Sequence, residues 1–394
     1  IGTDLCVMRH YAVFGTFLSF SCMLYSILTC LNFANPFRQE GWKGVRFMNT
    51  YLMKKAMIET AVDRGIKEME DDPKRSIRRL TDLGKQFSRN RFQETVFSVM
   101  QELLNNENSA YYDMMHNLIK NSEKESLKKF GVNFGYMSWS YGAARVREKE
   151  TKEGVLIPWT IMLRYDAKAE DGLTMDRLSS LMEQGQDLGI YAYFIRECAD
   201  DEDSYALLEL LERYKECAYV WFKSNGRLTA AQIQRLRVCR NSLVCLPLSD
   251  PETSLTAALL RDQKIPFALY LEYGRDSILP GLADVYKESV LASETAMFFL
   301  ISADGADCAA ADLAYRSRLE QKYPFVIMDY YGDGQSISRV LCEHTNLLEI
   351  GSDGSMIRPD GQKGEPFPFE LPLIDALRQV MPPKKPFSES HPEA

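Results

Sequence analysis

The sequence lacks the residue spacings that most metal and nucleotide sites require. Its nine cysteines and four histidines form no CxxC pair and no pair of histidines four residues apart, so the spacing of a zinc site is missing. No GxGxxG motif or phosphate-binding P-loop follows the first predicted strand. These absences exclude the usual zinc, dinucleotide and nucleotide sites.

An excess of basic residues is also absent. The 47 lysines and arginines are outnumbered by 55 aspartates and glutamates, which gives a net charge of -8 at pH 7. Binding to phosphate backbones needs clustered positive charge, so we expect no nucleic-acid partner. The odd number of unpatterned cysteines favours reduced thiols, as in a cytoplasmic protein.

Charge is missing altogether from one N-terminal run. No charged residue occurs from Tyr11 to Phe37, and residues 12–34 are long enough to cross a bilayer, which takes about 20 apolar residues. Residues 1–47 therefore have two open interpretations: a hydrophobic extension that does not belong to the natural protein, or a membrane anchor. The first predicts a cytoplasmic protein, the second a single-pass membrane-anchored one.

The remainder divides into three predicted parts. Apolar residues at three- and four-residue spacing predict an all-α helical leader domain over residues 48–135. The predicted strand-and-helix domain covers residues 136–330, with the alternation beginning after Gly154. Residues 331–394 form a short C-terminal extension whose Pro-rich end, from residue 381, is expected to be disordered. We expect residues 131–154 to be a connector and residues 330–335, "YYGDGQ", to be a turn.

The alternating part predicts an α/β fold. Its predicted strands cover residues 157–165, 191–197, 218–223, 242–247, 267–273, 296–301 and 325–329. The predicted helices between them cover residues 174–189, 204–217, 229–239, 251–265, 279–291 and 308–323. Repeated β-α units give a parallel sheet, either an open doubly wound one or a barrel. We favour a partial (β/α)6 TIM-like barrel.

The order of segments resembles that of the radical S-adenosylmethionine (radical SAM) enzymes, especially bacterial members with a helical leader and a SPASM-like, cysteine-bearing C-terminal extension. The likeness covers residues 48–381. It lies in "VLIPWTIML" as the first strand, in the next helix and strand with Gly185 and Gly189, in "KSNG" after the third strand, and in a C-terminal run with Cys342. In that family a CxxxCxxC loop after the first strand holds a [4Fe-4S] cluster that binds and cleaves S-adenosylmethionine.

The motifs that carry the family's chemistry are missing here. The loop after the first strand reads "YDAKAEDG" and has no cysteine, and "ECAD" from Glu197 stands where the family has GGEP. Asp360 stands where a later cysteine is expected. A cluster needs several thiolates around one point. Cys198, Cys239 and Cys245 could substitute only if they converged, and three ordinary buried thiols is the favoured alternative.

Charged residues at the predicted strand ends are the candidate ligand-binding residues, because barrels place their sites there. They are Arg164, Asp166, Glu197, Lys223, Asn225, Asp250, Glu272, Arg275 and Asp329. Alternation along a strand would point Arg164 with Asp166, and Lys223 with Asn225, inward together. Three interpretations remain open: the charges pair and close a vacated cavity, they hold a polar ligand or peptide, or Glu197 or Asp329 acts as an acid or base.

The resemblance and its gaps lead to two functional hypotheses. The first is a degenerate, cluster-free pseudoenzyme that needs no cofactor and binds a ligand, a peptide or an intact radical SAM homologue. The second is a radical SAM enzyme that modifies or matures a peptide or natural product. It would have displaced cluster ligands, with S-adenosylmethionine or a [4Fe-4S] cluster as cofactor, or a new activity at the strand ends. No catalytic residue and no metal ligand is assigned.

Overall fold

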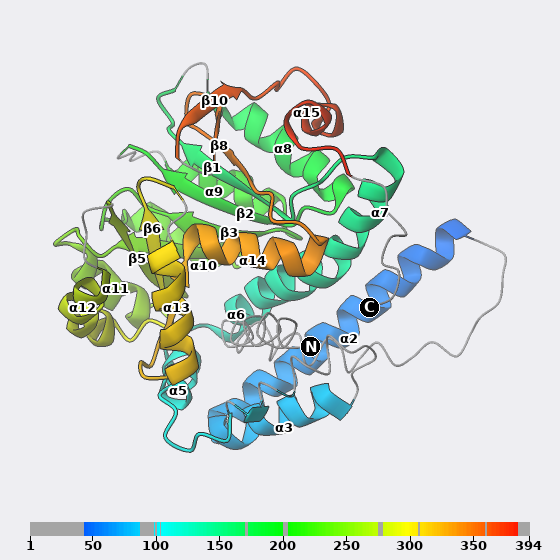
Figure 1. The fold of residues 1–394 in the computed structure, drawn as a ribbon. Coiled ribbons are helices and arrows are strands. Elements are labelled where there is room, and N and C mark those ends of the chain that lie inside the picture. Colours follow the sequence, from blue (N-terminus) through cyan, green and yellow to red (C-terminus); the bar gives the residue numbers. More distant parts are fainter. Residues whose placement is uncertain are drawn as a thin grey trace, which may run out of the picture.

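The structure is a computed structural model that describes residues 43–86, 98, 101–102, 104–169, 172–199, 204–274, 279–305, 308–358 and 361–384. Helices come first along the chain, alternating strands and helices follow, and a small strand-rich segment closes it (Figure 1). The apolar run at residues 12–34 lies outside the described residues. Within the described ones, no helix is both long and apolar enough to span a bilayer.

The N-terminal part is helical, as the apolar spacing predicts. Its helices are α2 (Lys43–Asp71), α3 (Pro73–Gln86), α5 (Tyr111–Asn121), α6 (Lys124–Gly131), the π-helix η2 (Val132–Gly142) and α7 (Ala143–Glu153). α2 packs against α3, α5, α6 and η2. In Figure 1, α2 (blue) runs outside the sheet, and α6 lies on the side of α2 that faces the sheet.

The central part alternates strands and helices at nearly the predicted positions. The strands are β1 (Thr160–Tyr165), β2 (Ala192–Glu197), β3 (Ala218–Phe222), β4 (Ser242–Pro247), β5 (Phe267–Tyr273), β6 (Met297–Ser302) and β7 (Val326–Asp329). The helices are α8 (Met175–Leu188), α9 (Ser204–Arg213), α10 (Ala230–Val238), α11 (Thr253–Asp262), α12 (Leu279–Ser293) and α13 (Cys308–Glu320). Local chemistry sets the ends: Thr174 and Thr229 cap α8 and α10, and Gly189 ends α8 at a φ of 101°.

The strand order confirms the α/β fold and its barrel-like winding. The described strands form one ten-stranded sheet in the order β10-β9-β8-β1-β2-β3-β4-β5-β6-β7, with every pair from β1 to β7 parallel. A doubly wound sheet reverses its strand order at a switch point, and this order does not reverse. Parallel crossovers of one hand then place the connecting helices on one face of the sheet. The sheet ends at β7 and β10, so the barrel is partial.

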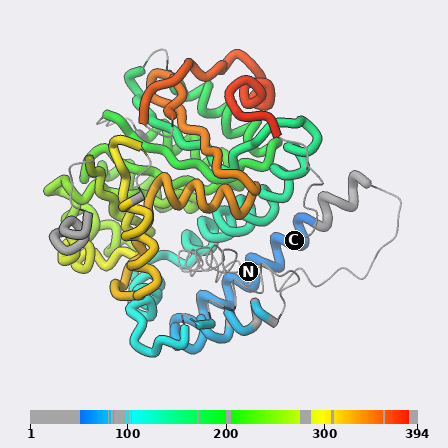
Figure 2. Tube along the Cα trace, in the orientation of Figure 1, coloured from blue at the N-terminus to red at the C-terminus, as the bar shows by residue number. Residues whose placement is uncertain are grey.

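The other face of the sheet is covered by α14 (Tyr330–Cys342), which corrects the turn predicted at residues 330–335. Figure 1 and the tube in Figure 2 show α14 (orange) lying across the strands. The helix begins because the Asp329 carboxylate accepts from the Gly332 backbone N–H at 3.1 Å. Gly332, one of the glycines that suggested a turn, leaves room for this cap, because a Cβ at its position would lie 2.2 Å from the Asp329 carboxylate.

The connector predicted at residues 131–154 is also wrong, because η2 and α7 are continuous helix there. A π-helix is wider than an α-helix and is rare at this length. Nine of its 11 residues are buried, so no polar stripe marks it in the sequence. Phe134 packs against Trp159 and Phe194 with ring centroids 6.2 and 6.3 Å apart, which joins η2 to the sheet.

The C-terminal segment extends the sheet beside β1. β8 (Leu348–Ile350) pairs with β1 in parallel, and β9 (Ser355–Ile357) and β10 (Lys363–Pro366) follow antiparallel before α15 (Leu373–Val380). The tail from residue 381 is not disordered at its start: Pro383 forms a bridge with Val155, and the Lys384 backbone N–H donates to the Gly154 carbonyl at 3.0 Å. Residues 385–394 lie outside the described part.

Candidate functional site

Two arginines stand side by side at the carboxyl ends of the first strands. Arg164 of β1 and Arg196 of β2 are partners in the strand register, so both project from the face that α14 covers. Like charges this close need anions near them. Glu349 of β8, Glu272 of β5 and Tyr331 of α14 supply the neighbours; with the two arginines they are called the charged cluster below.

Arg164 is held by fixed partners. Its Nε donates to Glu349 Oε1 at 2.7 Å, and its guanidinium donates to the Tyr331 hydroxyl at 3.2 Å. That hydroxyl donates to Glu349 Oε2 at 3.0 Å, which closes a three-residue network. Glu349 is only 4% exposed, so this half of the cluster is an ion pair whose carboxylate is buried and fully hydrogen-bonded.

Arg196 has a looser carboxylate partner. Its guanidinium lies 3.1 Å from Glu272 Oε2, and the Arg196 side chain is 11% exposed whereas that of Glu272 is 49% exposed. The guanidinium also lies over the Tyr330 ring, 5.6 Å from its centroid. Burial alone lowers the pKa of Arg196, but the surrounding Tyr330 and Glu272 raise it overall, so the cation is retained.

Glu197 and Lys223 do not lie in the charged cluster, against the expectation that Lys223 points inward with Asn225. Glu197 follows Arg196 in β2, and Lys223 follows Phe222 of β3, so each points to the opposite face from its neighbour. Their side chains are both 1% exposed and pair at 2.8 Å. Trp221 Nε1 also donates to Glu197 Oε1 at 3.0 Å, so this buried pair is held within the sheet and offers no open binding position.

Asp329 is buried at the end of β7. The residue is 1% exposed, and its Oδ1 has no hydrogen-bond partner among the described residues. Burial and the neighbouring Asp333 carboxylate raise the pKa of Asp329 to about 8. The Asp333 carboxylate accepts a bidentate pair of hydrogen bonds from the Arg318 guanidinium, at 2.8 and 3.0 Å. A buried acid could hold a proton here, but it caps α14 and faces no opening.

The remaining candidates take part in short turns. Asp166 accepts from the Lys168 backbone N–H, Asn225 from that of Arg227, and Asp250 from that of Glu252. Arg275 lies outside the described residues. The structure therefore brings together Arg164 and Glu272 of the predicted set, and pairs Glu197 with Lys223 separately.

The thiols of the described residues do not fit a [4Fe-4S] cluster. Cys198 is exposed just after β2, whereas Cys239 is buried at the other end of the sheet, where its Sγ lies 3.2 Å from Ser242 Oγ at the start of β4. Cys245 lies within β4 and is 0% exposed. Across the described part of the chain, no group of three or more His, Cys, Asp and Glu side chains is placed to hold a metal ion.

Tyr331 and Glu349 of the cluster, and Tyr330 beside it, were not predicted from the sequence. Tyr330 and Tyr331 fell in a predicted turn, and Glu349 lay in a segment to which no strand was assigned. A lone glutamate in the otherwise apolar "LLEI" was the available indication, because a buried carboxylate in a strand needs a cationic partner.

A second arrangement, Ser338, His344 and Glu150, has the residue types of a hydrolytic triad. His344 Nε2 lies 2.9 Å from Glu150 Oε1, and its Nδ1 lies 3.4 Å from Ser338 Oγ. Nδ1 also accepts from the Asn346 backbone N–H at 3.2 Å, which places the ring proton on Nε2, facing Glu150. With its Nδ1 taken and Ser338 and Glu150 both 0% exposed, the group joins α7 to the C-terminal segment and has no substrate access.

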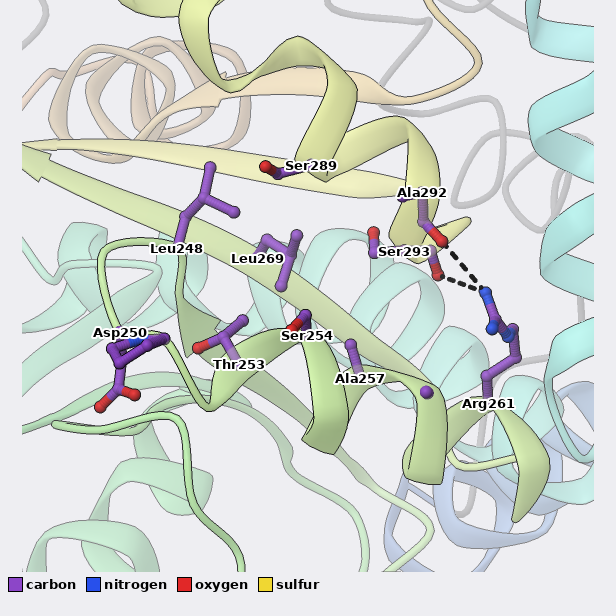
Figure 3. A pocket seen from close by; sticks show the side chains of 12 residues that line it. Leu248, Asp250, Thr253, Ser254, Ala257, Arg261, Leu269, Ser289, Ala292 and Ser293 are labelled. Atoms are coloured by element: carbon purple, nitrogen blue, oxygen red, sulfur yellow. Dashed lines mark hydrogen bonds between the residues drawn. The ribbon is translucent and has the colours of Figure 1, made fainter.

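A groove of about 330 Å³ lies between α11 and α12 (Figure 3), and none of the residues that line it belongs to the charged cluster. Leu248 and Leu269 line its floor, and Ser254 and Ser289 line its walls. Arg261 at one end donates to the carbonyls of Ala292 and Ser293 at 3.2 and 3.5 Å, which the dashed lines in Figure 3 show. Its charged side chain is therefore used within the fold.

The fold and the charged cluster define an α/β protein with a partial barrel whose strand ends carry a neutralised set of charges. Two solved structures are similar to it. Streptococcus suis SuiB bound to S-adenosylmethionine is 12% identical, with a TM-score of 0.42, over 87% of this chain and 83% of that chain. SuiB bound to precursor peptide SuiA is 12% identical, with a TM-score of 0.41, over 60% of this chain and 68% of that chain. No family model and no curated protein matches the chain.

Proposed function

We propose that this chain is a cluster-free homologue of the radical SAM enzymes that binds a ligand, a peptide or a partner protein without catalysing the radical reaction. The observation that carries the proposal is the loop from Asp166 to Thr174, which joins β1 to α8 and contains no cysteine or histidine. A cluster at that position needs several thiolates from this loop. No other described thiols converge to replace them.

The covered face of the sheet supports the same proposal. Tyr330 of α14 packs on Phe194 and Phe222 with ring centroids 5.9 and 5.4 Å apart, so the protein's own side chains fill space over the middle strands. The charges at the strand ends are already paired with one another. What is left for an outside molecule is the rim, where Glu272, Arg164 and Cys198 reach solvent.

The competing proposal is an enzyme with displaced cluster ligands, and the exposed Cys198 beside the charged cluster is the observation in its favour. Anaerobic iron-sulfur reconstitution separates the two. We expect no absorbance near 400 nm and no 5'-deoxyadenosine from S-adenosylmethionine. A brown protein that forms 5'-deoxyadenosine would reject the binding proposal. The Cys198→Ser variant, prepared in parallel, tests whether any iron bound depends on that thiol.

Binding is tested directly by calorimetry. S-adenosylmethionine and a peptide are the first ligands to titrate, because the sequence resemblance implies both. Charge reversal at Arg164 should weaken any binding found, and Arg316→Glu on the exposed surface of α13 is the matched control. If Arg164→Glu leaves the affinity unchanged, the charged cluster is not the binding position.

We further propose a cytoplasmic location for the part of the chain from residue 48.

A further inference from the structure

We propose that the charged cluster receives a ligand carboxylate, and that the Glu272 side chain occupies this position when no ligand is bound. The inference rests on the proposed binding function and names the chemical group that would be recognised. Two positive and two negative side chains meet in the cluster, so it is neutral as the structure has it. A monocarboxylate that takes the place of Glu272 keeps that neutrality.

The two carboxylates of the cluster differ in how firmly they are held. Glu349 is 4% exposed and accepts hydrogen bonds from both Arg164 and Tyr331. Glu272 is 49% exposed, and Arg196 is its single ion-pair partner among the described residues. Half-exposed pairs contribute about 0–1 kcal/mol. Another anion can therefore take the place of Glu272 on Arg196 at small cost, whereas Glu349 is fixed on Arg164.

Arg196 does need an anion. Its side chain is 11% exposed, and a buried cation without a counter-charge is strongly unfavourable. Glu272 stands on β5, and β3 and β4 lie between it and β2, so its side chain reaches across the sheet to make this contact. A ligand carboxylate that enters from the rim can make the same contact with Arg196.

Tyr330 supplies an independent indication. Its hydroxyl is buried and has no hydrogen-bond partner among the described residues, and the residue is 3% exposed. The charged groups that act on this hydroxyl most strongly are Glu349 and Arg196, so it lies beside the cluster. Buried hydroxyls without partners are uncommon in folded proteins. A carboxylate with one oxygen on Arg196 and the other on Tyr330 would satisfy it.

The charge balance selects a carboxylate over a phosphate. A phosphate dianion in place of Glu272 would leave the cluster with a net negative charge beside the fixed Glu349 carboxylate. Because Glu349 and Tyr331 already engage Arg164, that arginine cannot swing over to share the extra charge. A planar carboxylate also matches the two donors available, one guanidinium and one hydroxyl.

The test is ligand-observed NMR with glutarate, and with glutaramide as the uncharged match. Glu272→Gln removes the internal competitor, so we expect it to bind glutarate about fivefold more tightly than the unsubstituted protein. Glu252→Gln, at an exposed ion pair with Arg227, is the control and should bind as the unsubstituted protein does. Tyr330→Phe in the Glu272→Gln background should lose about fivefold, since it removes one hydrogen bond.

Equal affinity in Glu272→Gln and the unsubstituted protein would overturn the inference, as would equal binding of glutaramide. Comparison of glutarate with N-acetylalanine then separates a side-chain carboxylate from a peptide C-terminus as the source. The binding function and the carboxylate site are contradicted by different results. If a peptide binds and Glu272→Gln does not change its affinity, the binding function stands and the carboxylate site falls. If a cluster assembles, the binding function falls while the glutarate result still decides the site.

Discussion

At the scale of single residues, the face of the sheet on which a charge lies decides what it can do. Arg196 and Glu197 are adjacent in β2, yet one lies in the half-open charged cluster and the other in a sealed ion pair. Sequence alone places both at a strand end. The face follows only once the register of β1, β2 and β3 is known.

The sealed pair makes a clear prediction about stability. Lys223→Met removes the cation that lies 2.8 Å from the buried Glu197 carboxylate, so we expect a loss of about 3–5 kcal/mol in the free energy of unfolding. The double variant Glu197→Gln with Lys223→Met should recover most of that loss, because the neutral amide still accepts from Trp221 Nε1, which lies 3.0 Å from Glu197 Oε1. Urea unfolding measures both. A double variant no more stable than Lys223→Met would contradict this account.

Asp329 predicts a dependence of stability on pH. Its pKa is raised to about 8, first by burial and then by Asp333, so the folded protein holds a proton that the unfolded chain has released between about pH 4 and 8. This carboxyl therefore contributes less stability as the pH rises through that window. Asp329→Asn is neutral throughout and keeps an acceptor for the Gly332 N–H.

We expect the stability of Asp329→Asn relative to the unsubstituted protein to rise by about 2–4 kcal/mol from pH 5 to pH 8. Urea unfolding at several pH values measures it. A difference that stays constant with pH would show that the Asp329 carboxyl does not titrate in this range.

The site could be predicted from sequence only in part. Arg164 and Glu272 were found because barrel sites lie at strand ends, and they do meet at the charged cluster through Arg196. Glu349 and Tyr331 could not be found in this way. They come from chain segments some 170 residues after β1 that return to its edge, and no local pattern encodes that return.

At the scale of elements, the sequence predicted the seven strands from β1 to β7 and the six helices between them. The helices show apolar residues at three- and four-residue spacing, whereas β3, β4 and β7 are short apolar runs buried on both faces, and the regular alternation of the two patterns is what the sequence shows. η2 and the start of α14 were missed for opposite reasons. η2 is buried all round and has no polar stripe, and α14 has two glycines, which are favoured in turns, among its first five residues.

The start of α14 yields a prediction with an internal control. A Cβ on Gly332 would lie 2.2 Å from the Asp329 carboxylate oxygen that accepts the Gly332 N–H, so Gly332→Ala must displace the cap of the helix. We expect a loss of about 1–2 kcal/mol in unfolding free energy. Gly274→Ala has nothing within 4 Å of the added carbon and should change stability little. Equal effects of the two substitutions would contradict the capping role.

At the scale of the whole molecule, the C-terminal segment ties distant parts together. Lys384 Nζ donates to Glu150 Oε2 at 3.0 Å, and Glu150 Oε1 accepts from the Ile157 backbone N–H at 2.8 Å, just before β1. Compared with a chain that ends at Lys384, one that ends at Val380 loses the contact between Lys384 and Glu150 and the bridge between Pro383 and Val155. We expect its Tm to be about 2–4 °C lower. Equal Tm values for the two truncations would show that this link does not stabilise the fold.

The helical leader and the sheet share one hydrophobic core, so we expect them to unfold together, although residues 48–135 are predicted to be a separate domain. The predicted boundary between residues 135 and 136 falls inside η2. Phe134 lies before this boundary and Trp139 after it, and the ring centroid of each is 6.2 Å from that of Trp159. Loss of either part would expose these rings to water. Far-ultraviolet circular dichroism follows the loss of helix, and tryptophan fluorescence reports on Trp139 and Trp159 at the junction. The thermal unfolding transitions measured by the two methods should therefore coincide. A loss of helix that precedes the change in fluorescence would show that the leader unfolds independently of the barrel.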